Sequence, residues 1–150
     1  MYPKQMKPLL VAASLLASAF TQGGYAADTS INLPVTSLKY FDSGVGALKI
    51  SPAFGDPSKG AHSTFVKLPA GFVSSLHTHS ADYYAVVISG VIANAETVEE
   101  PNVPLAPGSY WFQKGQAKHV TKCLSANECI VFITQPAKFD YIATGHTDAE

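Results

Sequence analysis

Residues 71–90 of this chain read GFVSSLHTHSADYYAVVISG, and this stretch decides the fold class. Two short runs rich in β-branched and aromatic residues, 73–79 and 83–88, are separated by Ser-Ala-Asp and are typical of strands. His77 and His79 lie two positions apart in the first run. Because side chains alternate between the two faces of a strand, both imidazoles are expected on one face. Two imidazoles at that spacing can share a metal ion at N–metal distances of about 2.0–2.1 Å.

Short strands of the same kind are predicted on both sides of this stretch. They cover 64–68, 91–95, 110–112, 117–121, 130–134 and 138–143. Gly, Pro, Asn or Asp lie in most of the gaps, and beyond residue 26 no long window has the 3.6-residue apolar period of a helix. Segment 27–57 is expected to add one or two outer strands. Many short strands without intervening helices predict a single all-β domain, a sandwich or a barrel.

Composition indicates how many domains the chain forms and which kinds of partner it can bind. The chain has 150 residues, of which 47% are hydrophobic and 14% are charged, and its formal net charge is −1. That length accommodates one domain with a real core, and the low charged fraction argues against disorder. All ten basic residues are lysines. With a net charge near zero, the chain lacks an electrostatic footprint for nucleic acid, which we exclude as a partner.

Residues 1–26 have the three-part layout of a cleavable secretory signal. Two lysines precede an apolar run over 9–20, and Gly24 and Ala26 lie at −3 and −1 of the expected cut. The apolar run is shorter than the roughly 20 residues of a membrane span, although a retained N-terminal anchor is the alternative. We therefore predict a signal peptide and a mature domain, 27–150, with net charge −3. That domain would be periplasmic or secreted and free of the membrane after cleavage.

Cys123 and Cys129 fit an oxidising compartment. They flank the polar segment Leu-Ser-Ala-Asn-Glu, which is typical of a hairpin loop. Cross-strand positions beside a tight loop can meet disulfide geometry, so we predict a disulfide across a hairpin, with two free thiols as the alternative. A zinc site built on these cysteines is not expected, because no histidine or further cysteine lies at the required spacing.

The stretch around the histidines resembles the first signature of the cupin superfamily. That signature runs glycine, five residues, His-x-His, three or four residues, an acid, six residues and a glycine. Gly71, His77, His79 and Gly90 occupy its fixed positions, whereas Tyr83 replaces the acid. The run His-Thr-His-Ser-Ala-Asp-Tyr further resembles a group of exported cupins of unknown function.

A weakened second cupin signature follows. Gly108 precedes His119 by the spacing that the family requires, but Lys114 and Gln116 replace the family's proline and glycine. The resemblance implies a small antiparallel jelly-roll barrel with a metal pocket at its mouth. It implies that the metal ligands are His77, His79 and His119. The cofactor would be one divalent ion, Fe, Zn, Mn or Ni.

Replacement of the acid by Tyr83 alters the expected site. Three neutral imidazoles leave the full +2 charge of a divalent ion, so an anionic ligand is held more strongly and a bound water is more acidic. Tyr83 is the best candidate for a catalytic acid or base. Three roles are open to it: a core aromatic, a hydroxyl donor to a metal-bound oxygen, or a phenolate ligand.

Other polar and aromatic residues near the signatures have weaker claims. Alternation places Asp82 on the opposite face from Tyr83, as a solvated acid near the strand start. His62 and His146 lie in polar surroundings and are expected to be solvated. Alternation also allows some of the aromatic residues of 84–112 to line the pocket; these are Tyr84, Tyr110, Trp111 and Phe112.

The resemblance implies a small-molecule enzyme. With iron, oxidative cleavage of a diketone-like or enol-like substrate, as in cupin dioxygenases, is expected; zinc, manganese or nickel would favour hydrolysis, isomerisation or lyase chemistry. The first alternative is a non-catalytic exported module that binds a metal or small ligand. The second is a structural barrel with vestigial histidines. Cupin barrels often dimerise through outer strands, so a homodimer is a further expectation.

Overall fold

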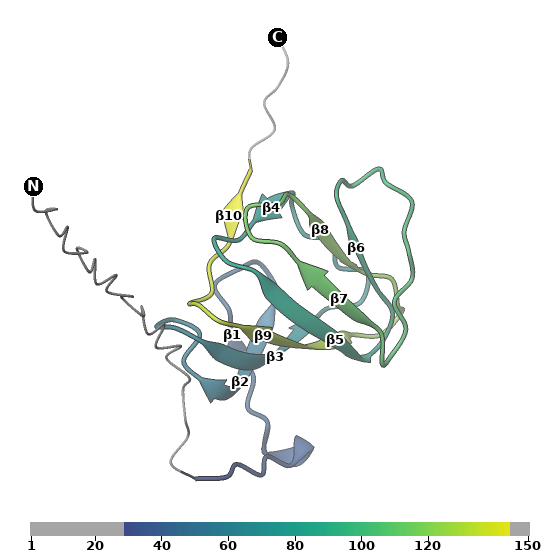
Figure 1. Cartoon of the computed structure of the whole chain (residues 1–150). Helices are drawn as coiled ribbons and strands as arrows, with labels where there is room; N and C mark the ends of the chain where they lie inside the picture. Colours follow the sequence, from purple (N-terminus) through teal and green to yellow (C-terminus); the bar gives the residue numbers. More distant parts are fainter. Residues whose placement is uncertain (1–28, 145–150) are drawn as a thin grey trace, which may run out of the picture.

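The structure of the protein, a computed structural model, describes residues 29–144 (Figure 1). The predicted signal peptide and His146 lie outside the described residues. Within this range no helix has the length and apolar character needed to cross a membrane. The elements are η1 (Val35–Ser37), β1 (Phe41–Asp42), β2 (Lys49–Gly55), β3 (His62–Leu68), β4 (His77–Thr78), β5 (Tyr83–Ser89), β6 (Ile92–Ala95), β7 (Tyr110–Gln113), β8 (Val120–Cys123), β9 (Cys129–Gln135) and β10 (Ile142–Ala143).

The strands form two antiparallel layers (Figure 1). One layer is a six-stranded sheet in the order β1-β2-β3-β9-β5-β7. The other consists of the pairs β10-β4 and β6-β8, which isolated bridges join at Val73–Lys122 and His77–His119. The prediction of a single all-β domain of the jelly-roll type is confirmed, and segment 27–57 does supply outer strands, β1 and β2.

Strict alternation along β5 explains how this strand faces the core. Tyr83, Ala85 and Val87 are buried, whereas the residues between them are exposed. This two-residue period is the one that the sequence shows, and it turns one face of the strand toward the opposite layer. The buried side chains join a core that includes Trp111 of the neighbouring strand β7 and Ile92 of β6 in the opposite layer.

The strand predicted over 73–79 is interrupted, which is a correction. Only His77–Thr78 forms a ladder, with β10, while Val73 makes a single bridge to Lys122. The Ser74 side chain explains the break. Its hydroxyl accepts a hydrogen bond from the Thr121 N–H at 3.0 Å, so a side-chain oxygen replaces a backbone carbonyl in the ladder.

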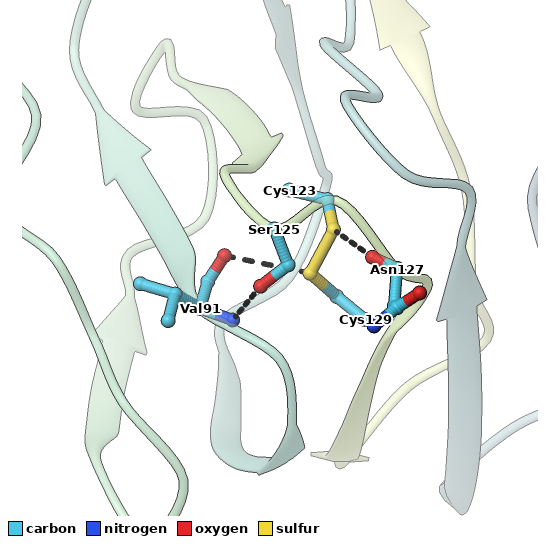
Figure 2. The surroundings of a disulfide bond; sticks show 5 residues. All are labelled: Val91, Cys123, Ser125, Asn127 and Cys129. Carbon is cyan, nitrogen blue, oxygen red and sulfur yellow. Dashed lines mark hydrogen bonds between the residues drawn. A yellow bond between two sulfur atoms is a disulfide. The ribbon is translucent and has the colours of Figure 1, made fainter.

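The predicted Cys123–Cys129 disulfide is present, but the predicted hairpin is wrong (Figure 2). Cys123 ends β8, which pairs with β6, whereas Cys129 begins β9, which pairs with β3 and β5. The intervening loop therefore passes from one layer to the other, and the disulfide joins the two sheets. A short polar loop between two apolar runs has the same sequence pattern in both cases, so the pattern could not separate them.

Gly90 lies where the β5–β6 turn approaches this disulfide. Its φ is +77°, and an added Cβ would lie 2.7 Å from Cys129 Sγ and 3.0 Å from Cys129 Cα. Gly90→Ala is therefore expected to lower the free energy of unfolding by about 2–4 kcal/mol, from the left-handed backbone and the overpacking together. Urea denaturation measures this loss. Gly44→Ala is the control, because Gly44 has φ +79° but no heavy atom within 4 Å; equal losses would contradict the steric explanation.

Candidate metal centre

Three histidines from two elements of the smaller layer meet at one end of the barrel. His77 lies in β4, His79 follows it, and His119 immediately precedes β8. Backbone hydrogen bonds set the register, since His77 N donates to His119 O at 3.1 Å and His119 N donates to His77 O at 2.9 Å. All three side chains are buried, and one ring nitrogen of each lies within 4.8 Å of the others. The structure thus brings together the three histidines that the sequence singled out.

Each of the three imidazoles is held through Nδ1 by a backbone carbonyl. His77 Nδ1 lies 2.9 Å from Ser75 O and His119 Nδ1 lies 3.2 Å from Ala117 O; His79 Nδ1 bonds to Asp140 O. Because a carbonyl oxygen can only accept, Nδ1 carries the proton in all three rings. Nε2 is then left with a free lone pair, which is the tautomer that metal coordination through Nε2 requires.

The rings are also neutral at pH 7. Burial lowers the pKa of His77 to about 4 and the pKa of His119 to about 3, and it lowers the pKa of His79 as well. The Asp140 carboxylate, whose Oδ1 is 3.9 Å from His79 Nδ1, therefore faces a neutral ring rather than an imidazolium. Three neutral imidazole donors suit Zn, Fe or Ni, so the residues present fit a divalent ion.

Tyr83 lies beside His119 on the opposite layer. Its hydroxyl oxygen accepts a hydrogen bond from Trp111 Nε1 at 3.3 Å and lies 3.4 Å from His119 Nε2. Since His119 Nε2 carries no proton, the Tyr83 hydroxyl is the donor in that contact. Burial raises the pKa of Tyr83 to about 12, so the phenol stays protonated at neutral pH. The Tyr83 ring belongs to the hydrophobic core and its hydroxyl is directed at His119 Nε2, so both the role of core aromatic and that of hydroxyl donor stay open.

The two departures from the second signature lie in the β7–β8 loop, which contacts the β4–β5 connection that carries the nearby acid, Asp82. Asp82 is exposed, as predicted, and its Oδ1 accepts a hydrogen bond from Gly115 N at 2.6 Å. Gln116, at the family's glycine position, has φ 64° and is the one non-glycine residue with positive φ in the described part of the chain. Its N–H donates to His79 O at 2.7 Å. The left-handed turn that a glycine would provide is therefore kept without the glycine.

His62 corrects a prediction: it is buried rather than solvated, with 4% of its surface exposed. Thr64 Oγ1 lies 2.9 Å from its Nδ1, and Gln135 Oε1 lies 3.3 Å from its Nε2. Burial lowers the pKa of this ring too. Lys59-Gly60 upstream made the position look like a loop. Extending the predicted strand from 64 back to 62 would have placed His62 on the inward face with Thr64.

A cavity of about 70 Å³ lies between the two layers at this end of the barrel. The polar groups facing it include His62, His77, His79 and Tyr83, and no residue lining it within 29–144 carries a full charge. Of the four aromatic residues that the sequence offered, Trp111 lines the cavity; the other three, Tyr84, Tyr110 and Phe112, are exposed on the outer face. Aromatic walls are supplied instead by Phe72, Phe139 and Tyr141. At this volume, below the roughly 300–1,000 Å³ of typical small-molecule pockets, the cavity admits only a very small ligand beside His77 and His79.

Comparison with known proteins identifies the family of the chain. A family model described as "Domain of unknown function (DUF4437)" matches residues 41–142. No curated protein sequence gives a significant match.

Solved structures of low sequence identity superpose on most of the chain. An RmlC-like cupin protein from Ralstonia eutropha has a TM-score of 0.57 and 18% identity, over 73% of this chain and 69% of that one. The polyketide cyclase RemF from Streptomyces resistomycificus has a TM-score of 0.65 and 12% identity, over 80% and 89%. An acetylacetone dioxygenase from Acinetobacter johnsonii has a TM-score of 0.57 and 16% identity, over 75% and 76%. At these identities the likeness shows the fold, which is that of the cupins.

Proposed function

This chain belongs to the DUF4437 family of cupin-like domains, and on that premise we propose that it is an exported metal-dependent protein that acts on a small molecule. One observation carries the proposal: three buried, neutral imidazoles, each with Nδ1 on a carbonyl, have one ring nitrogen each within 4.8 Å of the others, and two of them, His77 and His79, line a cavity. A core that only needed filling would use apolar side chains there, because buried polar groups cost free energy unless they are satisfied. Their shared tautomer is the one that a metal needs.

His77, His79 and His119 would hold a divalent ion, Fe, Zn, Mn or Ni, through Nε2. When bound, such an ion supplies Lewis acidity and, in the case of iron, redox chemistry at the oxygen atoms of a substrate. Tyr83 would act as the catalytic hydroxyl: with an ion on His119 Nε2, its Oη–H would no longer donate to that nitrogen and could hold a proton toward the ligand, while Trp111 Nε1–H keeps the phenol oriented. The apolar and aromatic lining would exclude water from the reacting end of the ligand.

The reaction class that we propose is a dioxygenase-like or related metal-assisted conversion. The acetylacetone dioxygenase, a DMSP lyase and a polyketide cyclase share the fold. The absence of charged side chains from the cavity lining within 29–144 favours a small substrate with no charge beyond the one that the ion neutralises.

A non-catalytic module that binds a metal or small ligand is the second candidate. Tyr83 in place of the acid, and Lys114 and Gln116 in place of proline and glycine, favour it. In this case the same three histidines would bind an ion without turnover.

The proposed location is the periplasm or the exterior, with cleavage after Ala26. The N-terminal layout supports it, and so does a disulfide that persists in an oxidising compartment. Mass spectrometry of the exported protein should give an N-terminus at Ala27. Light scattering on the same preparation tests the expected homodimer.

The experiment that tests the function starts from untagged exported protein. Metal analysis should find about one Fe, Zn, Mn or Ni per chain, and the Fe(II)-loaded protein should consume oxygen with one or more members of a panel of small diketones and phenols. Tyr83→Phe should then slow turnover by roughly 100-fold, a typical loss for a positioned acid or base, and retain the metal. If the protein holds a stoichiometric metal but turns over no member of the panel when loaded with several metals in turn, the non-catalytic binding module is the better account. No metal, together with His119→Ala indistinguishable from wild type, would refute both.

A further inference from the structure

After β9 the chain passes over the end of the barrel that carries the three histidines. We call this segment, residues 139–144, the strap. In Figure 1 it is the yellow end of the described chain, running beside β4. We propose that the strap positions two of the three histidines, with the Asp140 backbone and the Tyr141 side chain as positioning groups. The proposal rests on the proposed function only where it concerns the affinity for metal.

Asp140 sets the tautomer of His79. Its carbonyl oxygen accepts the His79 Nδ1–H, so Nε2 is the nitrogen left free. Its carboxylate is used in a different contact, since Oδ1 accepts a hydrogen bond from Ser80 N at 2.9 Å. Asp140 is therefore tied through its carboxylate to the backbone of Ser80, next to His79, and through its carbonyl to the His79 ring.

Tyr141 holds His77 in two ways. The two rings stack with centroids 4.1 Å apart and an interplanar angle of 18°. The Tyr141 hydroxyl lies 2.6 Å from Ser75 Oγ and donates to Ser75 O at 3.3 Å. Ser75 O is also the acceptor for His77 Nδ1–H, so Tyr141 touches both the ring and the carbonyl that sets its tautomer.

Contacts on both sides of these residues fasten the strap across the mouth. At its start, Phe139 N donates to Pro57 O at 2.7 Å, in the β2–β3 connection. At its end, β10 pairs with β4, with Ala143 opposite His77, and Thr144 N donates to Leu76 O at 3.0 Å. His119, in contrast, takes its Nδ1 partner from Ala117 in its own loop. Loss of strap contacts should therefore disturb His77 and His79 but spare His119.

The decisive variant is Tyr141→Ala. Removing an outer partner of a metal-ligating histidine typically costs 10–100-fold in affinity, so cobalt(II) binding should weaken by at least roughly tenfold. Tyr141→Phe keeps the stacked ring and should restore most of the affinity. Ile142→Ala is the matched control on the strap, because Ile142 is 47% exposed and its loss should leave binding unchanged.

The second measurement needs no metal. Nitrogen-15 spectra of the imidazoles in the metal-free protein report which ring nitrogen is protonated, and Tyr141→Ala should give a mixed tautomer at His77 with His119 unchanged. Tyr141→Leu, which keeps an apolar cover, serves if the alanine variant does not fold. Wild-type tautomers and affinity in folded Tyr141→Ala or Tyr141→Leu would overturn the proposal. If wild type binds no cobalt, the proposed function fails, and the tautomer at His77 alone decides on the strap.

Discussion

Replacing His119 by alanine is expected to lower the affinity for a divalent ion by more than roughly 100-fold, beyond the loss that outer partners of a metal site cause. His119 is the one member of the trio that comes from a separate part of the chain, since His77 lies in β4 and His79 directly follows that strand. Without it, two neighbouring imidazoles remain, and a small divalent ion would have to take further ligands from water. Competition titration with a chromophoric chelator measures the change.

The control for this variant is His62→Gln. His62 is a buried histidine that faces the same cavity, but its ring nitrogens are engaged by Thr64 and Gln135, and it is not part of the three-histidine cluster. Its replacement should cost far less than the 10–100-fold that loss of an outer partner of a metal ligand causes. Equal losses in the two variants would mean that the ion binds elsewhere or that general damage to the cavity explains the effect.

Removing the disulfide with Cys123→Ala and Cys129→Ala together is expected to lower the free energy of unfolding by about 2–4 kcal/mol. The cysteines are six residues apart, so the entropic contribution of loop closure lies toward the low end of that range. The position of the disulfide in the fold adds to this stabilisation. The bridge ties the end of β8 in one layer to the start of β9 in the other, and both cysteines are fully enclosed, at 2% and 0% exposed.

Urea denaturation of the double variant measures this loss. A residue beside the disulfide supplies the control. Ser125, in the loop between the two cysteines, accepts a hydrogen bond from Val91 N at 2.8 Å through its hydroxyl (Figure 2). Ser125→Ala removes that single contact and should cost only about 1 kcal/mol. Wild type treated with reductant should match the double variant. An unchanged urea midpoint in the double variant would show that the covalent link between the layers is dispensable.

Local patterns explain why much of the fold was predictable. The alternation of Tyr83 to Ile88 shows directly which face of β5 is buried, because a strand exposes every second residue to one side. Turn residues bounded the strands for a related reason, since glycine, proline and asparagine disfavour a continuing ladder. The trio His77, His79 and His119 came from spacing matched to a known signature, and the structure brings these residues together.

The errors have a common physical origin in contacts between distant parts of the chain. The loop between Cys123 and Cys129 looks like a hairpin until β8 and β9 are seen to pair with different partners. His62 looks solvated until Gln135, 73 positions later, is found beside its Nε2. Neither pairing leaves a mark in the local sequence, because each partner is an ordinary residue in its own segment.

The sequence by itself therefore determined the class of the fold through short-range periodicity, and its resemblance to the cupin signatures singled out the three histidines. Only the tertiary structure decided how those histidines are held. The carbonyl that sets the tautomer of His79 belongs to Asp140, 61 positions away, and the ring that stacks on His77 belongs to Tyr141. Local carbonyls hold Nδ1 of His77 and His119, but which nitrogen of His79 is free to bind an ion depends on a segment that reaches it only when the barrel closes.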